Sequence, residues 1–169
     1  MDYSLKTKRG EVKKNSLKFY LIFAILIILS VVIDQITKVI TTNKSIKIIG
    51  DFLQIYYTEN TGVAFSFLSG KSWIFIPVSI ISVIILIVLF ILKKQKSMLF
   101  TISLSLIVGG AVGNVIDRVV LGYVRDFIYF NFFPAIFNFA DSCVTIGTIL
   151  LLVYLVFFFG KEVKNEKNI

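Results

Sequence analysis

Residues 19–39 read FYLIFAILIILSVVIDQITKV, and this stretch decides the fold class. Its first 15 residues, Phe19–Ile33, carry no charge. A helix crosses a bilayer with about 20 predominantly apolar residues. Three further apolar stretches of comparable length follow it, at Ser72–Leu92, Met98–Val120 and Phe139–Phe159. The sequence therefore predicts an integral membrane protein, mainly α, built as a bundle of four transmembrane helices.

The composition agrees with this class and excludes several kinds of site. Hydrophobic residues make up 57% of the 169 positions, against about 45–50% in soluble domains. The length suits a single membrane domain. Histidine is absent and Cys143 is the only cysteine, so catalytic triads with histidine, common zinc sites and intrachain disulfides are excluded. We expect the first helix to be retained, because its apolar run exceeds that of a signal peptide and no A-x-A-like site follows it.

The basic residues predict the orientation of the helices. Twelve of the 18 Lys and Arg residues lie in three clusters that flank apolar stretches, at Lys6–Lys18, Lys93–Lys96 and Lys161–Lys167. Such clusters mark the cytoplasmic side of a membrane and attract anionic lipid. We therefore expect residues 1–18, the 93–97 link and residues 160–169 to be cytoplasmic. The net charge of +8 then indicates a membrane partner rather than nucleic acid.

Two outer segments, residues 40–71 and 121–138, remain on the extracytoplasmic side. In the first, β-branched and aromatic residues from Ile46 to Tyr57 surround a Gly50-Asp51 turn signal, which predicts a small β-sheet. The sheet either caps the bundle or offers a strand edge to an extended peptide. In the second, three phenylalanines form either an aromatic shelf or simple interfacial anchors: Phe127, Phe132 and Phe133.

Ionisable residues in or near a span are costly and call for a partner or a function. Asp34 and Lys38 are four residues apart and share a helical face. Asp34 either forms a local ion pair with Lys38 or reaches another helix or a headgroup. In the third stretch, Gly109 and Gly113 form a small-xxx-small pair that favours close helix packing.

Further along the third stretch, Asn114, Asp117 and Arg118 fall on one face together with Gly110. We interpret Asp117 as a structural clamp that the neighbouring Arg118 keeps ionised.

Asp126 and Asp141 carry the strongest functional signal in the chain. Asp126 follows the third stretch and Asp141 begins the fourth, so both are expected at the outer membrane boundary. Asn138 and Asp141 are also candidates for capping the fourth helix. Two adjacent carboxylates share a proton, so one activates water while the other polarises a carbonyl. This hydrolytic chemistry needs neither histidine nor metal.

Five blocks, taken in order, identify the chain as similar to the lipoprotein signal peptidases, also called signal peptidase II. The resemblance extends from about Phe19 to Phe159. The blocks are Asp34–Lys38, Asn60–Ser66, Gly113–Arg118, Val124–Phe127 and Phe137–Asp141. Val63 departs from the alanine that is frequent in this family.

The resemblance implies a four-helix bundle with an extracytoplasmic sheet and an aspartic endopeptidase without a cofactor. It implies that Asp126 and Asp141 are catalytic. It assigns supporting or substrate-binding roles to eight residues: Asp34, Lys38, Asn60, Gly62, Asn114, Asp117, Arg118 and Asn138.

The implied substrates are prolipoproteins that carry a diacylglyceryl group, cut just before the modified cysteine at the outer face of the bacterial cytoplasmic membrane. The implied inhibitor is globomycin, and we expect a monomer.

Three other functions fit the sequence less well. A proton-coupled transporter would need an acidic group near mid-bilayer and an inner exit, which the second and fourth stretches do not offer. Other intramembrane aspartic proteases carry a Gly-x-Gly-Asp signature, which this sequence lacks. A membrane assembly factor without activity is disfavoured by the five-block match.

Overall fold

The computed structural model describes residues 3–62, 72–93 and 97–159, with side chains from residue 17 onward. Val63–Ser66, the end of the second block, lies outside the described residues. The elements in chain order are α1 (Tyr3–Thr41), β1 (Ser45–Ile49), β2 (Leu53–Asn60), α2 (Ser72–Leu92), α3 (Met98–Leu121), β3 (Val124–Phe130), β4 (Ile136–Phe137), α4 (Phe139–Tyr154) and the π-helical turn η2 (Leu155–Phe159). The basic stretch expected to be a tail is thus helical from Tyr3.

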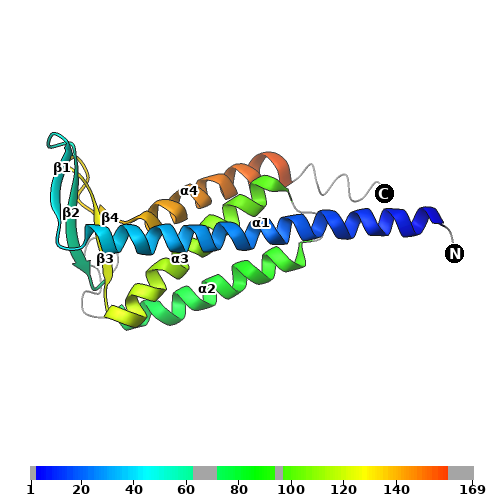
Figure 1. The fold of residues 1–169 in the computed structure, drawn as a ribbon, viewed down its shortest axis with the longest axis horizontal. Coiled ribbons are helices and arrows are strands. Elements are labelled where there is room, and N and C mark those ends of the chain that lie inside the picture. The colour runs from blue at the N-terminus through cyan, green and yellow to red at the C-terminus, as the bar shows by residue number, and fades with distance from the viewer. Residues whose placement is uncertain (1–2, 63–71, 94–96, 160–169) are drawn as a thin grey trace.

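The four predicted helices are confirmed, and each is long and apolar enough to cross a bilayer. Helix α3 is the central one, since it packs against α1, α2 and α4 (Figure 1). It also carries more buried positions than any other helix, among them Leu104 and Val108. The outward faces of the other helices are lined by exposed Ile, Leu, Val and Phe side chains. An apolar exterior around a tightly packed centre is the pattern of a protein whose solvent is lipid.

Glycine allows α3 to approach its neighbours closely. A Cβ atom added at Gly109 would lie 2.6 Å from the Cβ of Ser30 on α1, and one at Gly113 would lie 2.5 Å from Oδ2 of Asp34. Both distances are too short for a real side chain. The packing role predicted for this glycine pair is therefore confirmed, and its partner is α1.

The sheet lies at one end of the bundle, and the start of α1 and the end of η2 lie towards the other (Figure 1). Its four strands are antiparallel in the order β1-β2-β3-β4. The small sheet predicted around Gly50-Asp51 is confirmed: β1 pairs with β2, and Gly50 between them adopts a φ of +49°, a conformation that costs glycine little. Strands β3 and β4 come from the second outer segment, where no strands were expected.

The connections after α3 and before α4 bring the two key aspartates to the same end. Gly122 ends α3 in a left-handed conformation, with φ of +85°, and the chain turns directly into β3. Asn138 then caps α4 immediately after β4. Asp126 in β3 and Asp141 in the first turn of α4 are thereby held by rigid elements rather than by loops.

Candidate active site

Asn138 links the two aspartates directly. Its side-chain Nδ2 donates a 2.6 Å hydrogen bond to Asp126 Oδ1, and its backbone N–H donates to Asp141 Oδ2 at 3.1 Å. Its Oδ1 accepts from the backbone N–H of Asp141 at 2.8 Å, which completes a capping box. The capping role predicted for Asn138 and Asp141 is thus confirmed. The two carboxyl groups are connected through hydrogen bonds to this one asparagine.

Asn114 on α3 supports this arrangement from the other side. Its Nδ2 donates to Asp141 Oδ1 at 2.8 Å, while its Oδ1 accepts from Lys38 Nζ at 2.9 Å and from Asn138 Nδ2 at 3.1 Å. An ammonium group can only donate, so Lys38 forces the oxygen of the Asn114 amide to face it. The amide NH₂ must then point at Asp141. A buried cation on α1 therefore fixes a donor on the candidate catalytic carboxylate.

The end of β2 provides a second donor to Asp126. Asn60 Nδ2 lies 2.9 Å from Asp126 Oδ2. The Oδ1 of Asn60 accepts from the backbone N–H of Gly62 at 3.0 Å, so the next turn of the chain orients the amide. Asp126 thus receives one amide donor on each oxygen and is only 2% exposed.

Four buried or partly buried side chains, two cationic and two anionic, form a group of ion pairs next to this site. Lys38 contacts Asp34 at 2.8 Å and Asp117 at 3.5 Å, and Arg125 donates to both oxygens of Asp117, at 3.1 and 2.7 Å. Two cations opposite two anions leave little net charge, which is what burial in a low-dielectric bundle requires. Asp34 also accepts from the backbone N–H of Ala140 in the first turn of α4. It therefore forms the local ion pair and also reaches another helix.

The prediction that Arg118 keeps Asp117 ionised is wrong. The ion-pair partner is Arg125 of β3, and Arg118 points elsewhere, although it is adjacent in the sequence. The reason is helix geometry, since successive residues project about 100° apart on a helix. Asp117 therefore faces α1 and β3, while Arg118 faces Gly62, which follows β2. The face that was expected to hold both side chains is divided between two environments.

Arg118 borders a cavity of about 320 Å³ that also exposes Asp141, Asn114 and Thr145. Its Nη2 donates to the carbonyl oxygen of Gly62 at 3.3 Å, and the guanidinium lies 5.6 Å from the centre of the Phe75 ring. Its Nε is the one buried side-chain nitrogen or oxygen without a hydrogen-bond partner within the described part of the chain. The cavity is thus lined by a carboxylate, an amide and a guanidinium group.

The environment of Asp126 shifts its acidity strongly. Burial and the nearby negative charge of Asp141 raise the pKa of Asp126 to about 7, although the hydrogen bonds from Asn60 and Asn138 oppose the shift. A carboxyl group that titrates near neutral pH beside a second carboxyl is suited to hold a shared proton.

Two residues of this site were missed at the sequence level. Gln35 donates to Asp117 Oδ1 at 3.2 Å and accepts from Arg125 Nη2 at 2.9 Å. The position of Arg125 could have indicated its role, because a charged residue at a membrane boundary needs a partner.

Phe127 was expected at the surface, but it is only 5% exposed because β3 turns that face towards the bundle. Phe132 and Phe133 are exposed, as a surface shelf or anchor requires.

Within residues 3–62, 72–93 and 97–159, no three His, Cys, Asp or Glu side chains are placed so that they could hold a metal ion. The polar contacts of Asp126 and Asp141 come instead from three asparagines, Asn60, Asn114 and Asn138.

Comparison with known proteins gives a consistent result. A family model described as signal peptidase (SPase) II matches residues 26–157. The lipoprotein signal peptidase of Caldanaerobacter subterraneus subsp. tengcongensis is 44% identical over 140 residues, which cover 79% of this chain and 96% of that protein. The lipoprotein signal peptidase of Staphylococcus aureus is 41% identical over 160 residues, which cover 89% of this chain and 96% of that one.

The fold comparison agrees with the sequence comparison. A solved structure described as a bacterial membrane enzyme superimposes with a TM-score of 0.74 at 39% identity, covering 79% of this chain and 87% of that one. A four-helix membrane bundle, a small sheet at one end and a match of this extent lead to one conclusion: the chain belongs to the signal peptidase II family.

Proposed function

We propose that Asp126 and Asp141 form the catalytic pair of this enzyme. As a signal peptidase II, the protein is an aspartic peptidase that removes signal peptides from prolipoproteins. The observation that carries the proposal is the shared residue Asn138, which donates one hydrogen bond to each carboxylate. Of the two, Asp141 lines the cavity beside Arg118, and Asp126 is connected to it through Asn138.

The mechanism follows from one proton shared by two acids. One ionised carboxylate removes a proton from water, and the resulting hydroxide equivalent attacks the scissile carbonyl carbon. The protonated partner donates a hydrogen bond to the carbonyl oxygen, on which negative charge develops. The carboxyl groups then return the proton to the leaving nitrogen. Asn60, Asn114 and Asn138 donate hydrogen bonds to the carboxylates, so the unprotonated member stays ionised in a buried site.

The substrate in this proposal is a prolipoprotein with a diacylglyceryl-modified cysteine, cut just before that cysteine. The lipid chains remain in the bilayer beside the helices while the peptide reaches the sheet end. Arg118, which lines the cavity, supplies a guanidinium group to a substrate carbonyl oxygen, and the supporting cluster of Asp34, Lys38 and Asp117 holds the helices that carry the site.

We also propose the orientation of the protein in the membrane. The termini and the 93–97 link are cytoplasmic, because they carry the basic clusters, and the sheet end with the aspartates is extracytoplasmic. The enzyme acts as a monomer in the cytoplasmic membrane, since both aspartates and their donors come from one chain. Globomycin is the expected inhibitor, and it would bind in the cavity that Arg118 and Asp141 line.

The test is cleavage of a lipidated precursor by purified protein. Asp126→Asn and Asp141→Asn are each expected to remove detectable processing, since an amide neither accepts the proton of water nor donates one to the carbonyl oxygen in the same way. Unlipidated precursor and added globomycin provide the specificity controls. If either variant processes the lipidated precursor at the normal rate, the assignment of the pair is wrong.

Asp51→Asn is the matched control for this experiment. Asp51 lies at the exposed tip of the β1–β2 hairpin and pairs only with Lys47, with both side chains about two-thirds exposed. The same chemical change there is expected to leave processing unchanged. A loss of activity in this variant as well would show that the assay responds to protein quality rather than to the pair.

A further inference from the structure

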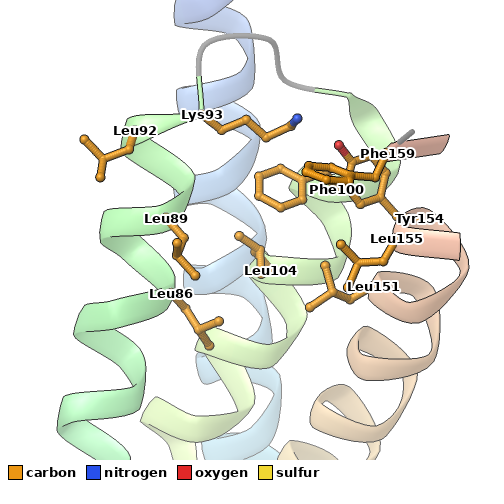
Figure 2. Close-up of a pocket in the computed structure, with 10 residues that line it drawn as sticks. All are labelled: Leu86, Leu89, Leu92, Lys93, Phe100, Leu104, Leu151, Tyr154, Leu155 and Phe159. Atoms are coloured by element: carbon orange, nitrogen blue, oxygen red, sulfur yellow. The ribbon is translucent and has the colours of Figure 1, made fainter. Parts of the chain in front are cut away.

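A second cavity lies at the end of the bundle opposite the aspartates, between α2, α3 and α4 (Figure 2). It measures about 430 Å³, within the range of about 300–1,000 Å³ that small-molecule sites occupy. Apolar side chains from all three helices line it, and none of them belongs to the catalytic site.

The cavity has a buried inner wall and an open side. Phe100, Leu104 and Tyr154 form the inner wall and are 8%, 1% and 1% exposed. Leu89 and Leu155 on the flanking helices are 52% and 46% exposed. The cavity therefore opens sideways from the bundle, in the direction of the lipid hydrocarbon that surrounds these helices.

Lys93 supplies the only charge among the lining residues. Figure 2 shows its side chain extending over the aromatic rings at the mouth of the cavity. Its ammonium nitrogen lies 5.4 Å from the ring centres of Phe100 and Tyr154 and 5.7 Å from that of Phe159, within cation–π range. Three rings thus hold a cation at the polar end of an apolar cavity.

The local backbone contributes to this arrangement. The last turn of the fourth helix, Leu155–Phe159, is π-helical rather than α-helical, and both of its end residues line the cavity. Short π-helical turns are rare and frequently mark functional sites. Here the turn brings the Phe159 ring within 6.4 Å of the Tyr154 ring, five residues earlier.

We propose that this cavity binds one chain of an anionic phospholipid, with the lipid phosphate at Lys93. An apolar cavity open to the hydrocarbon fits an acyl chain, and a caged cation at its mouth complements an anionic headgroup. Basic residues beside a span are the usual recognition element for anionic lipid. The inference is independent of the catalytic assignment.

The test uses the purified full chain in a mild detergent with equal amounts of phosphatidylglycerol and phosphatidylcholine of identical acyl chains. Native mass spectrometry counts the lipids that each protein retains. We expect phosphatidylglycerol to be retained about fivefold over phosphatidylcholine, which corresponds to about 1 kcal/mol, the attraction of one basic side chain to an anionic surface. Lys93→Gln is expected to remove the preference. Leu151→Trp, which fills the cavity, is expected to lower retention of both lipids.

Two control variants make the test specific. Ile85→Trp adds the same ring on an exposed face of α2 outside the cavity and is expected to leave retention unchanged. Lys96→Gln removes the same charge from the same link and is expected to keep the preference. Equal retention of the two lipids by the unmodified protein would overturn the proposal. So would an equal loss of preference in Lys96→Gln and Lys93→Gln, which indicates diffuse charge.

A different occupant would also be recognised. If the cavity receives the apolar part of a signal peptide, Leu151→Trp would raise the KM for precursor and leave lipid retention unchanged, and the lipid proposal would be wrong. Thermal melting of each variant checks folding. If Leu151→Trp does not fold, the comparison of Lys93→Gln with Lys96→Gln still decides the outcome.

Discussion

Replacing Asn138 separates the structural task of this residue from its chemical one. Asn138 is fully buried, caps α4 through Oδ1 and donates through Nδ2 to Asp126. Aspartate caps a helix as well as asparagine does, whereas alanine costs about 1 kcal/mol. In Asn138→Asp the cap is therefore kept, but the donor to Asp126 is exchanged for a carboxylate oxygen.

The size of the effect follows from the contact distance. The oxygen of Asp126 lies 2.6 Å from the present donor, so the new carboxylate is in contact with it. Two like charges about 4 Å apart repel by about 4 kcal/mol at an effective dielectric constant of about 20. This energy corresponds to a pKa change of about three units, since each unit is worth about 1.4 kcal/mol. Asp126, Asp141 and the carboxyl group introduced at position 138 then bind more protons at neutral pH. The ionised carboxylate that removes a proton from water is lost.

We therefore expect Asn138→Asp to lower kcat by about 100-fold or more at pH 7, the usual contribution of a positioned base. The assay is single-turnover cleavage of a lipidated precursor in detergent, followed by gel shift, with thermal melting measured in parallel. Asn138→Ser, a good cap without the amide donor, is the intermediate comparison. Near-normal cleavage by Asn138→Asp would refute the reasoning that the amide holds Asp126 for catalysis.

Three further predictions follow from the same geometry. First, kcat is expected to fall as the pH rises through about 7, because the pair then loses its shared proton. In Asn60→Ala the midpoint of this fall should move up by about one pH unit, since a hydrogen-bond donor that lowers the pKa of Asp126 is gone. An unchanged pH profile of kcat in this variant would contradict the prediction. Second, Gly109→Leu should lower the melting midpoint in detergent with little effect on kcat of the folded fraction, because its side chain would collide with α1, and an unchanged midpoint would count against close packing. Third, Arg125→Gln should destabilise the fold by about 3–5 kcal/mol, because Asp117 is left as a buried anion with a weaker partner, and restored stability in the double variant with Asp117→Asn is the check.

Asp126 makes the folded protein less stable as the pH rises, whereas an ion-paired carboxylate makes it less stable as the pH falls. The pKa of Asp126 is about 7 in the folded protein and 3.8 as its reference value, so the folded state binds more protons between these values. Its contribution to stability is present below about pH 4 and is lost as the pH rises through about 7. Asp126→Asn is therefore expected to melt no lower than the unmodified protein at pH 8. A lower midpoint at that pH would show that ionised Asp126 stabilises the fold.

Much of the architecture follows from the sequence because membrane spans leave strong local signals. Uncharged runs such as Phe19–Ile33 identify helices without knowledge of their neighbours. The first hairpin was also predictable, since Gly50 and the β-branched residues around it are local signals. Strand β4 was not, because it has only two residues and exists through its pairing with β3.

The site was less accessible to sequence reasoning than the fold. The spacing of Asp126 and Asp141 indicates a common depth, but the contact between them depends on how β3 pairs and where α4 begins. The error at Asp117 is of the same kind: adjacency in the sequence suggested Arg118, while the fold brings Arg125 from the following strand. Side-chain partners at this boundary are set by tertiary pairing, which no local pattern encodes.

We propose that Asp126 and Asp141 hold one proton between them near neutral pH. Infrared difference spectroscopy of the purified protein between pH 5 and pH 9 detects a protonated carboxyl group directly. We expect one protonated carboxyl signal that disappears as the pH rises through about 7 and that is absent or shifted in both Asp126→Asn and Asp141→Asn. A spectrum without any protonated carboxyl near pH 6, or a signal unchanged in both variants, would contradict it.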